Sequence, residues 1–151
     1  MNRLWNLFQS VLGLIFHHPI TGTSIIPVLP DGRIVLIQRR DNGKWALPGG
    51  MVEWGETIES TIQRELVEET GLQLTKVDRL VGVYSAPDRD RRFHSICVAI
   101  AVQVTGKTAV EDTLEIQGVQ AFERSELPIG HLSADNDRHL QDYFDNVTTL
   151  A

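Results

Sequence analysis

The 151-residue sequence has little cysteine and no excess of basic charge. Its single cysteine, Cys97, excludes an intramolecular disulfide, and its place in the apolar run SICVAIAV predicts a buried structural thiol. The formal net charge of −6 argues against a nucleic-acid backbone as the main partner, because proteins that bind one need a basic surface. We therefore expect no DNA partner, and a reducing, cytoplasmic location fits the cysteine usage.

The sequence also lacks an apolar run long enough to span a bilayer, which takes about 20 residues of helix. Residues 2–16 instead predict an amphipathic helix, with apolar side chains at helical spacings: Leu4, Trp5, Phe8, Val11, Leu12 and Ile15. We expect no transmembrane segment. The helix is expected to cover the domain, join a homodimer contact or rest on a membrane surface. A secretory signal is not favoured, because no small-x-small cleavage site follows the apolar stretch.

What the sequence does contain is typical of one globular domain. Hydrophobic residues make up 42% and charged residues 23% of the chain, and there is no internal repeat or long linker. We expect the amphipathic helix and a linker over residues 1–20, followed by a single folded domain over residues 21–151.

Apolar and alternating runs predict strands over residues 22–29, 33–40, 74–85, 92–105 and 114–123. A helix is expected from near Thr57, a candidate N-cap, to Gly71, a candidate left-handed end, and a last helix over 134–147. Pro27 lacks the N–H donor of a central strand, so the first strand is expected at a sheet edge or with a bulge. The order of elements predicts an α/β protein with a mixed sheet between helices.

The stretch from Gly50 to Leu72, GMVEWGETIESTIQRELVEETGL, concentrates negative charge. Glu65, Glu68 and Glu69 fall on one helical face, and like charges at these spacings cost roughly 0.2–0.5 kcal/mol per pair. Near a helix C-terminus they also oppose the macrodipole. A hard divalent cation, held by the carboxylates together with substrate phosphates, would relieve this repulsion. The alternative is a solvated acidic face.

A longer pattern, G-x5-E-x7-R-E-U-x-E-E-x-G-U with U a bulky aliphatic residue, decides between them. Its positions are all matched, by Gly50, Glu56, Arg64, Glu65, Leu66, Glu68, Glu69, Gly71 and Leu72. The probability of such a match by chance is on the order of 10⁻¹⁰ per starting position. This pattern is the Nudix box, and the chain resembles the Nudix hydrolases. The resemblance implies an α/β/α sandwich, which agrees with the mixed sheet expected above.

The resemblance also implies an activity and a cofactor. Nudix hydrolases use water to cleave the phosphoanhydride of a nucleoside diphosphate linked to another group, with Mg²⁺ or a related ion such as Mn²⁺. It implies metal ligation by the carboxylates of the box and by one backbone carbonyl: Glu65, Glu68, Glu69 and Gly50. Within the box, Arg64 and Glu56 are expected to form an ion pair that orients the loop and the helix rather than performing chemistry.

Further candidates lie outside the box. Glu115 is the candidate for an additional metal ligand or general base, because related sequences often carry a glutamate just before this strand. Glu111 is the second choice, and a solvated loop carboxylate is the alternative for both. The candidates for holding substrate phosphate are basic residues beside turns: Arg39, Arg40, Arg89, Arg91, Arg92 and His94. The alternative for these is an exposed charged surface.

The segment GVYSAPDRDRRFHS bears on the substrate. It resembles YSDP-x-RDPR-type loops of Nudix proteins described as ADP-ribose pyrophosphatases, but departs from them at Ala86, where aspartate is common, and at Arg91, where proline is common. We expect a nucleotide-type small molecule as substrate, with ADP-ribose or another nucleotide sugar ahead of nucleoside triphosphates. A nucleotide sensor without hydrolysis is the other alternative, although such sensors generally have a degraded box or an attached DNA-binding domain.

Overall fold

The computed structural model describes residues 18–90 and 93–151. Within them lie the strands β1 (Ile20–Val28), β2 (Ile34–Arg39), β3 (Trp45–Ala46), β4 (Gln73–Tyr84), β5 (Ser95–Thr105), β6 (Ile116–Phe122) and β7 (Thr149–Leu150). The helices are α2 (Ile58–Thr70), the 3-10 helix η1 (Arg124–Glu126) and α3 (Asn136–Phe144). The helix expected over residues 2–16 lies outside the described residues. In the described part of the chain, no helix is long and apolar enough to cross a membrane.

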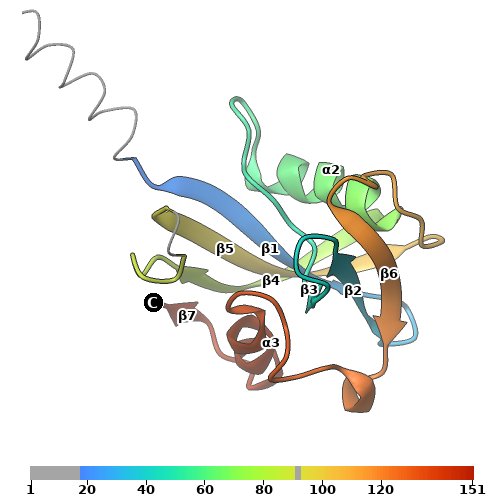
Figure 1. The fold of residues 1–151 in the computed structure, drawn as a ribbon. Helices are drawn as coiled ribbons and strands as arrows, with labels where there is room; N and C mark the ends of the chain where they lie inside the picture. The colour runs from blue at the N-terminus through green and yellow to red at the C-terminus, as the bar shows by residue number, and fades with distance from the viewer. Residues whose placement is uncertain (1–17, 91–92) are drawn as a thin grey trace, which may run out of the picture.

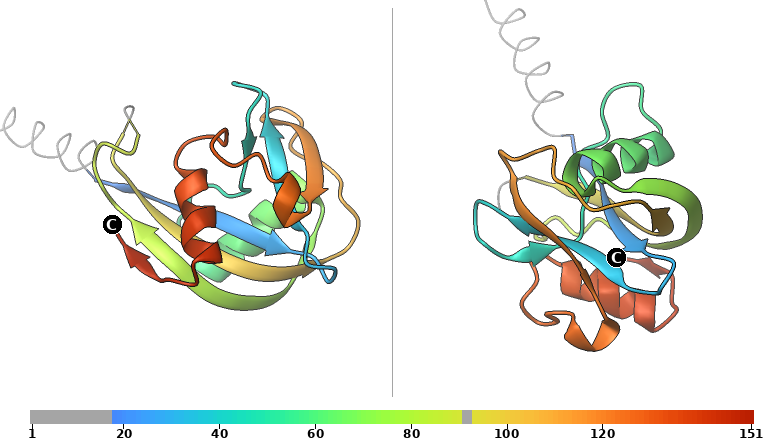
Figure 2. Two further views of the ribbon diagram at one scale, coloured as in Figure 1. Left: turned by 90° about the horizontal axis from the view of Figure 1, so that it is seen from below. Right: turned by 90° about the vertical axis from the view of Figure 1, so that its right-hand side faces the viewer.

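The strands form one mixed sheet with the order β3-β2-β1-β5-β4-β7, and β6 pairs with β2. β1 runs parallel to β5 and β4 parallel to β7, whereas the other pairs are antiparallel. α2 covers one face of the sheet and α3 the other (Figures 1 and 2). The α/β/α sandwich expected from the sequence is therefore confirmed.

Each face of the sheet has its own hydrophobic core, because successive side chains of a strand point to opposite faces. On β1, Ile25 packs in the cluster that contains Ile62 and Leu66 of α2. Its neighbour Ile26 packs in the cluster that contains Leu140 of α3. The two helices are thus held on opposite sides of β1, which places the residues of this strand between them.

The expectation that Pro27 requires an edge strand or a bulge is wrong. β1 lies between β2 and β5 and pairs with β5 in an unbroken register from Ile20 to Val28. The N–H groups of Thr23 and Ile25 point to the other side, where they bind the carbonyls of Gly50 and Pro48. By alternation Pro27 faces that side too, where β1 and β2 pair only at Val28, so no ladder hydrogen bond is lost.

The ends of α2 are set by local sequence, as expected. Thr57 accepts the N–H of Ser60 on its side-chain oxygen at 3.1 Å, and Ser60 accepts the N–H of Thr57 at 2.8 Å, which forms a capping box. Gly71 ends the helix with φ of 73°. α3 is shorter than the expected 134–147, because Ala134 and Asn146 have φ of 51° and 55°.

Candidate active site

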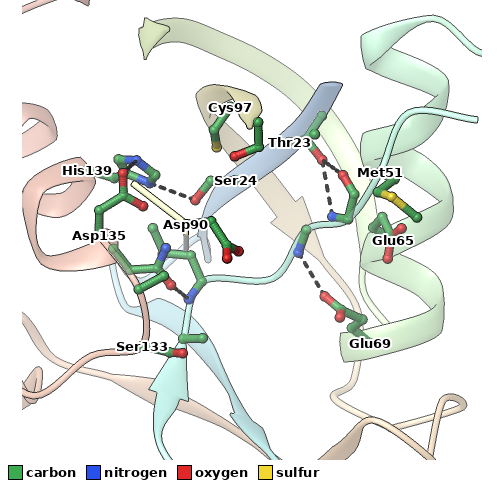
Figure 3. A pocket seen from close by; sticks show the side chains of 18 of the residues that line it. Thr23, Ser24, Met51, Glu65, Glu69, Asp90, Cys97, Ser133, Asp135 and His139 are labelled. Atoms are coloured by element: carbon green, nitrogen blue, oxygen red, sulfur yellow. Dashed lines mark hydrogen bonds and ion pairs between the residues drawn. The ribbon is translucent and has the colours of Figure 1, made fainter. Parts of the chain in front are cut away.

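A pocket of about 490 Å³ lies between the two helices, beside β1. Glu65 and Glu69 of α2 approach it from one side, and Asp135 and His139 from the other (Figure 3). Ser24 of β1 lies on the floor between them. The pocket therefore has two polar ends. We call the end with Glu65 and Glu69, beside α2, the acidic end, and the end with Asp135 and His139, at the start of α3, the second polar end.

The acidic end is a set of buried carboxylates rather than a solvated face. Glu65 is 8% and Glu69 5% exposed, whereas the side chain of Glu68 is 44% exposed. Burial first, and then neighbouring carboxylates including Glu65, raise the pKa of Glu69 to about 8 against the opposing effect of one backbone hydrogen bond. Burial also raises the pKa of Glu65, although Arg64 opposes the shift. The protein therefore compensates negative charge here only in part, and ionisation of Glu65 and Glu69 is disfavoured.

Three contacts hold these carboxylates. Arg64 Nη1 donates to Glu65 Oε1 at 2.7 Å and lies 3.4 Å from Glu68 Oε2. The Gly49 N–H donates to Glu69 Oε2 at 2.8 Å. With these partners in place, no three His, Cys, Asp or Glu side chains among residues 18–90 and 93–151 are gathered closely enough to hold a metal ion.

The chemistry of this donor set nevertheless fits a hard divalent cation. Carboxylate oxygens are the ligands that Mg²⁺ and Mn²⁺ prefer, and a cation would neutralise the charge that burial disfavours. If the carboxylates of Glu65, Glu68 and Glu69 all bound the cation, Glu65 and Glu68 would have to give up their contacts with Arg64. The Gly50 carbonyl already accepts the Thr23 N–H at 2.8 Å and the Thr23 hydroxyl at 3.3 Å, so a metal would have to replace the hydroxyl there.

The expected ion pair between Arg64 and Glu56 is present. Arg64 Nε donates to Glu56 Oε1 at 2.7 Å and Nη2 donates to Oε2 at 3.0 Å. Glu56 also accepts the N–H of Glu53 and the hydroxyl of Thr61. These hydrogen bonds, that of Arg64 first, lower the pKa of Glu56 to about 2. The pair thus ties the loop before α2 to the helix that carries the buried carboxylates.

The loop of Gly49 and Gly50 must approach the carboxylates closely. A Cβ atom on Gly49, whose φ is 150°, would lie 2.2 Å from the Thr23 carbonyl oxygen. A Cβ atom on Gly50 would lie 2.1 Å from Glu65 Oε1. Glycine at these positions lets the backbone pass between β1 and α2, which brings the Gly49 N–H to Glu69.

At the other end, α3 contributes a buried polar network. His139 is fully buried, and its Nδ1 lies 3.0 Å from the Ser24 hydroxyl. Its Nε2 lies 3.3 Å from Asp135 Oδ2, without hydrogen-bond geometry and with no other partner among the described residues. Burial would raise the pKa of Asp135, but its contacts with His139 and Arg89 outweigh burial and hold the pKa well below the usual value.

Arg89 completes this network. Its Nε and Nη2 donate to the two oxygens of Asp135 at 2.6 and 3.1 Å. Its Nη1 donates to the Tyr84 carbonyl at 3.0 Å and to Ser95. The side chain is only 15% exposed. Arg89 therefore joins the loop after β4 to the start of α3.

The sequence matches the NUDIX domain family over residues 18–143. The chain belongs to the Nudix family. An ADP-ribose pyrophosphatase of Methanocaldococcus jannaschii is 40% identical to it over 134 residues, which cover 85% of this chain and 75% of the relative. The expected enzyme class, a Nudix hydrolase, is thereby confirmed.

Solved structures show the same fold. A MutT Nudix hydrolase of Burkholderia pseudomallei superposes with a TM-score of 0.71 at 28% identity, over 83% of this chain and 98% of its own. The Nudix domain of Shewanella oneidensis NrtR, solved with ADP ribose, superposes with a TM-score of 0.78 over 97% of this chain and 99% of its own. At 17% identity, the second likeness concerns the fold alone.

Outside the Nudix box, the structure places Glu115 on the wall of the acidic end, with an exposed side chain. Asp112, which the sequence analysis missed, also lines the pocket, whereas Glu111 is not among the lining residues. Asp112 Oδ1 accepts the N–H groups of Leu114 and Glu115 at 3.1 and 3.2 Å, a local turn that orients the Glu115 backbone. Both carboxylates raise the pKa of Glu69.

The basic candidates are dispersed. Arg39 lines the pocket but pairs with both oxygens of Asp41 at 3.0 and 2.7 Å. Arg40 lines a smaller neighbouring cavity of about 280 Å³, which Glu115 also lines, and its Nε donates to the Thr113 carbonyl. That Arg39 and Arg40 contact substrate phosphate stays a prediction.

The remaining candidates lie in the loop after β4. Arg89 lines the pocket but uses its donors within the protein, as described above. The His94 ring lies 2.9 Å from the Ser85 carbonyl and is not among the residues that line the pocket. Arg91 and Arg92 lie outside the described residues. Cys97 lines the pocket and is partly buried rather than fully buried as expected from the sequence; burial raises its thiol pKa to about 11.

The raised pKa of Glu69 predicts a pH-dependent stability of the metal-free Nudix domain. Below pH 4.5, the usual pKa, Glu69 is protonated in both the folded and the unfolded state. Between pH 4.5 and about 8, Glu69 is ionised in the unfolded state but still protonated in the folded state. The free energy of unfolding should therefore fall as pH rises through this window, by on the order of a few kcal/mol. Thermal unfolding of metal-free protein between pH 5.5 and 8.5 measures the slope.

The Glu69→Gln variant provides the matched comparison for that slope. Because glutamine does not ionise, the free energy of unfolding of the variant should fall much less as pH rises. Excess Mg²⁺ should likewise make the free energy of unfolding of the unaltered protein fall less over the same pH range. Equal slopes in both proteins would show that Glu69 ionises normally.

Proposed function

We propose that the chain hydrolyses the phosphoanhydride of a nucleoside diphosphate linked to a second group, with ADP-ribose or another nucleotide sugar as the substrate. The observation that carries this proposal is the pair of buried carboxylates, Glu65 and Glu69, facing a pocket within a complete Nudix box. The relative from Methanocaldococcus jannaschii, itself an ADP-ribose pyrophosphatase, supports the choice of substrate.

The roles of the residues follow from their positions. Glu65, Glu68 and Glu69 would hold Mg²⁺ or Mn²⁺, which when bound neutralises phosphate charge and lowers the pKa of attacking water. Glu115, which lines the acidic end of the pocket and is exposed, would accept the proton of that water. The water oxygen forms a bond to one phosphorus while the bond from that phosphorus to the bridging oxygen breaks, which leaves two phosphate monoesters. Arg64 would hold the loop before α2 in a fixed position relative to the helix during the reaction.

The shape of the pocket agrees with a substrate of two parts. Its volume of about 490 Å³ is within the usual range for small-molecule sites. The acidic end suits the diphosphate together with a cation, because phosphate alone would be repelled there. The second polar end, with Asp135 and His139, lies beyond the Gly49–Gly50 loop and is available to the linked group.

A hydrolysis screen with Mg²⁺ and with Mn²⁺ tests the proposal. It should compare nucleotide sugars, dinucleoside polyphosphates and nucleoside triphosphates, and we expect kcat/KM to be highest for ADP-ribose or another nucleotide sugar by at least about tenfold. A preference for triphosphates would instead indicate a house-cleaning pyrophosphohydrolase. Tight nucleotide binding without any product would indicate a sensor.

A further inference from the structure

The described residues leave part of the sheet face that carries α2 uncovered. α2 packs on this face through Ile62 and Leu66, in a cluster with residues of β1, β2 and β5. At the other edge of the sheet, Val77 and Leu80 of β4 are 39% and 42% exposed, and Leu150 of β7 is 85% exposed. These three residues belong to none of the hydrophobic clusters that the described residues form.

The register of β4 gathers these apolar residues on one face. Its pairing with β5 shifts after Val77 and again after Leu80. Three β4 residues therefore lie opposite β5 residues of the α2 cluster, in the pairs Val77–Val102, Leu80–Ile100 and Val83–Val98. Directly opposed residues share a face, whereas simple alternation would send Val77 and Leu80 to opposite faces. Leu150 pairs with Val83 and shares its face.

We call Val77, Leu80, Val83 and Leu150 the uncovered strip. A β-bulge disrupts the local hydrogen-bond ladder and re-aims side chains, and here two bulges aim apolar side chains at the same uncovered face. Neighbouring apolar side chains exposed on one face indicate a contact with another apolar surface. The uncovered strip is therefore a docking face.

Residues 2–16, which lie outside the described residues, offer an apolar surface of matching length. Their large apolar residues recur at helical spacings: Leu4, Trp5, Phe8, Val11, Leu12 and Ile15. A helix over residues 2–16 would be about 22 Å long. The stretch of β4 from Val77 to Val83 spans about 20 Å. The two surfaces match in length and in apolar character.

The chain between residue 16 and β1 is long enough to bring such a helix to the strip. Ile20 pairs with Ser95 and Cys97 with Tyr84, so β1 begins at the end of the sheet where β4 ends. Figures 1 and 2 show the start of β1 and the C-terminus at this same end. Only β5 separates β1 from β4, a distance of about 10 Å. Four residues of extended chain span up to about 14 Å, so a helix can reverse there and lie over β4.

The same observations favour the strip of the same chain over two other partners. A tether of a few residues holds the segment beside its own strip at an effective concentration on the order of mM, which a second copy would have to match in solution. A helix that rests on a membrane surface is rich in Lys and Arg on its polar face. Residues 2–16 contain only Arg3.

We propose that residues 2–16 dock as an amphipathic helix on the uncovered strip of their own chain, beside α2. The docked helix would complete the layer of the sandwich to which α2 belongs. This inference is independent of the proposed hydrolysis, and its tests measure no activity.

Cross-linking tests the contact directly. Phe8, in the middle of the segment, should lie near Leu80, in the middle of the strip. In the double variant Phe8→Cys, Leu80→Cys, a bis-maleimide with a span of about 10 Å should join the two cysteines within one chain, as read by peptide mass spectrometry. Cys97 is present in every variant and reacts slowly, because burial raises its pKa.

Phe8→Cys with Ile129→Cys is the matched control. Ile129 is 45% exposed, like Leu80, but follows Leu127, which packs in the cluster on the α3 side. Its cross-linked fraction should be at least about tenfold lower. Equal fractions, or no cross-link within the chain for Phe8 and Leu80, would overturn the inference. Cross-links between two chains alone would also overturn it and would make a second copy the partner.

Thermal unfolding of the full chain gives a second, independent test. Leu80→Ser should lower the melting temperature by about 3 °C or more, but by less than about 1 °C in a chain that already carries Phe8→Ser and Leu12→Ser. Ile129→Ser should have the same effect in both chains. If Leu80→Ser also has the same effect in both, the segment does not contact the strip and the inference is refuted.

Discussion

Glu69→Gln should lower the turnover of the preferred substrate by at least about a hundredfold while the protein stays folded. The substitution keeps the size of the side chain and an acceptor for the Gly49 N–H. It removes the charge with which Glu69, 5% exposed, would hold a divalent cation. Steady-state kinetics at saturating Mg²⁺ measures the loss, and thermal unfolding establishes that the variant is folded.

Glu59→Gln is the matched control, because Glu59 lies in the first turn of the same helix and is exposed. Its turnover should remain within about twofold of the original value. Full activity in folded Glu69→Gln, or in the presence of excess chelator, would show that the buried carboxylates do not hold a catalytic metal.

Asp135→Ala should lower the free energy of unfolding by about 3–5 kcal/mol. The substitution leaves the guanidinium of Arg89, 15% exposed, without its carboxylate partner, and it removes the neighbour of the buried His139 Nε2. Because Asp135 joins the loop after β4 to α3, the loss should be global rather than local. Urea or thermal unfolding of the metal-free protein measures it.

The exposed pair of Arg33 and Asp31 supplies the control. It has a similar geometry, with a contact of 2.8 Å, but its side chains are 40% and 52% exposed. Asp31→Ala should therefore cost less than about 1 kcal/mol. If both substitutions cost the same small amount, Arg89 would be an ordinary surface charge and would be free to contact phosphate, as the sequence alone suggested.

The elements predicted best are those whose signals are local. α2 begins and ends where Thr57 and Gly71 predict, because capping depends on residues within one turn of the helix ends. The strands were placed to within a few residues by their apolar runs, whereas β3 and β7, of two residues each, carry no periodic signal. The prediction for Pro27 was wrong because the side of β1 on which backbone N–H donors are needed depends on the neighbouring strands.

The candidate site likewise has one part with a local sequence signal and one part without. The Nudix box identified the acidic end, since its residues lie on one helix and the loop before it. The second polar end joins Ser24 to His139 across 115 residues, and Arg89 to Asp135 across 46. Only the spacing of Asp135 and His139, four residues apart in the final helix, could have indicated it. Arg89 was therefore predicted to hold substrate phosphate, with an exposed charge as the alternative, instead of pairing with Asp135.

The most direct test of metal-dependent phosphoanhydride hydrolysis is product analysis by mass spectrometry after incubation with ADP-ribose in isotopically labelled water. We predict equimolar AMP and ribose 5-phosphate, with one labelled oxygen in only one of the two products. Formation of both should require a divalent cation and should be lost in Glu69→Gln. Equal product formation in excess chelator, or no cleavage of any nucleoside diphosphate derivative with Mg²⁺ or Mn²⁺, would contradict the assignment.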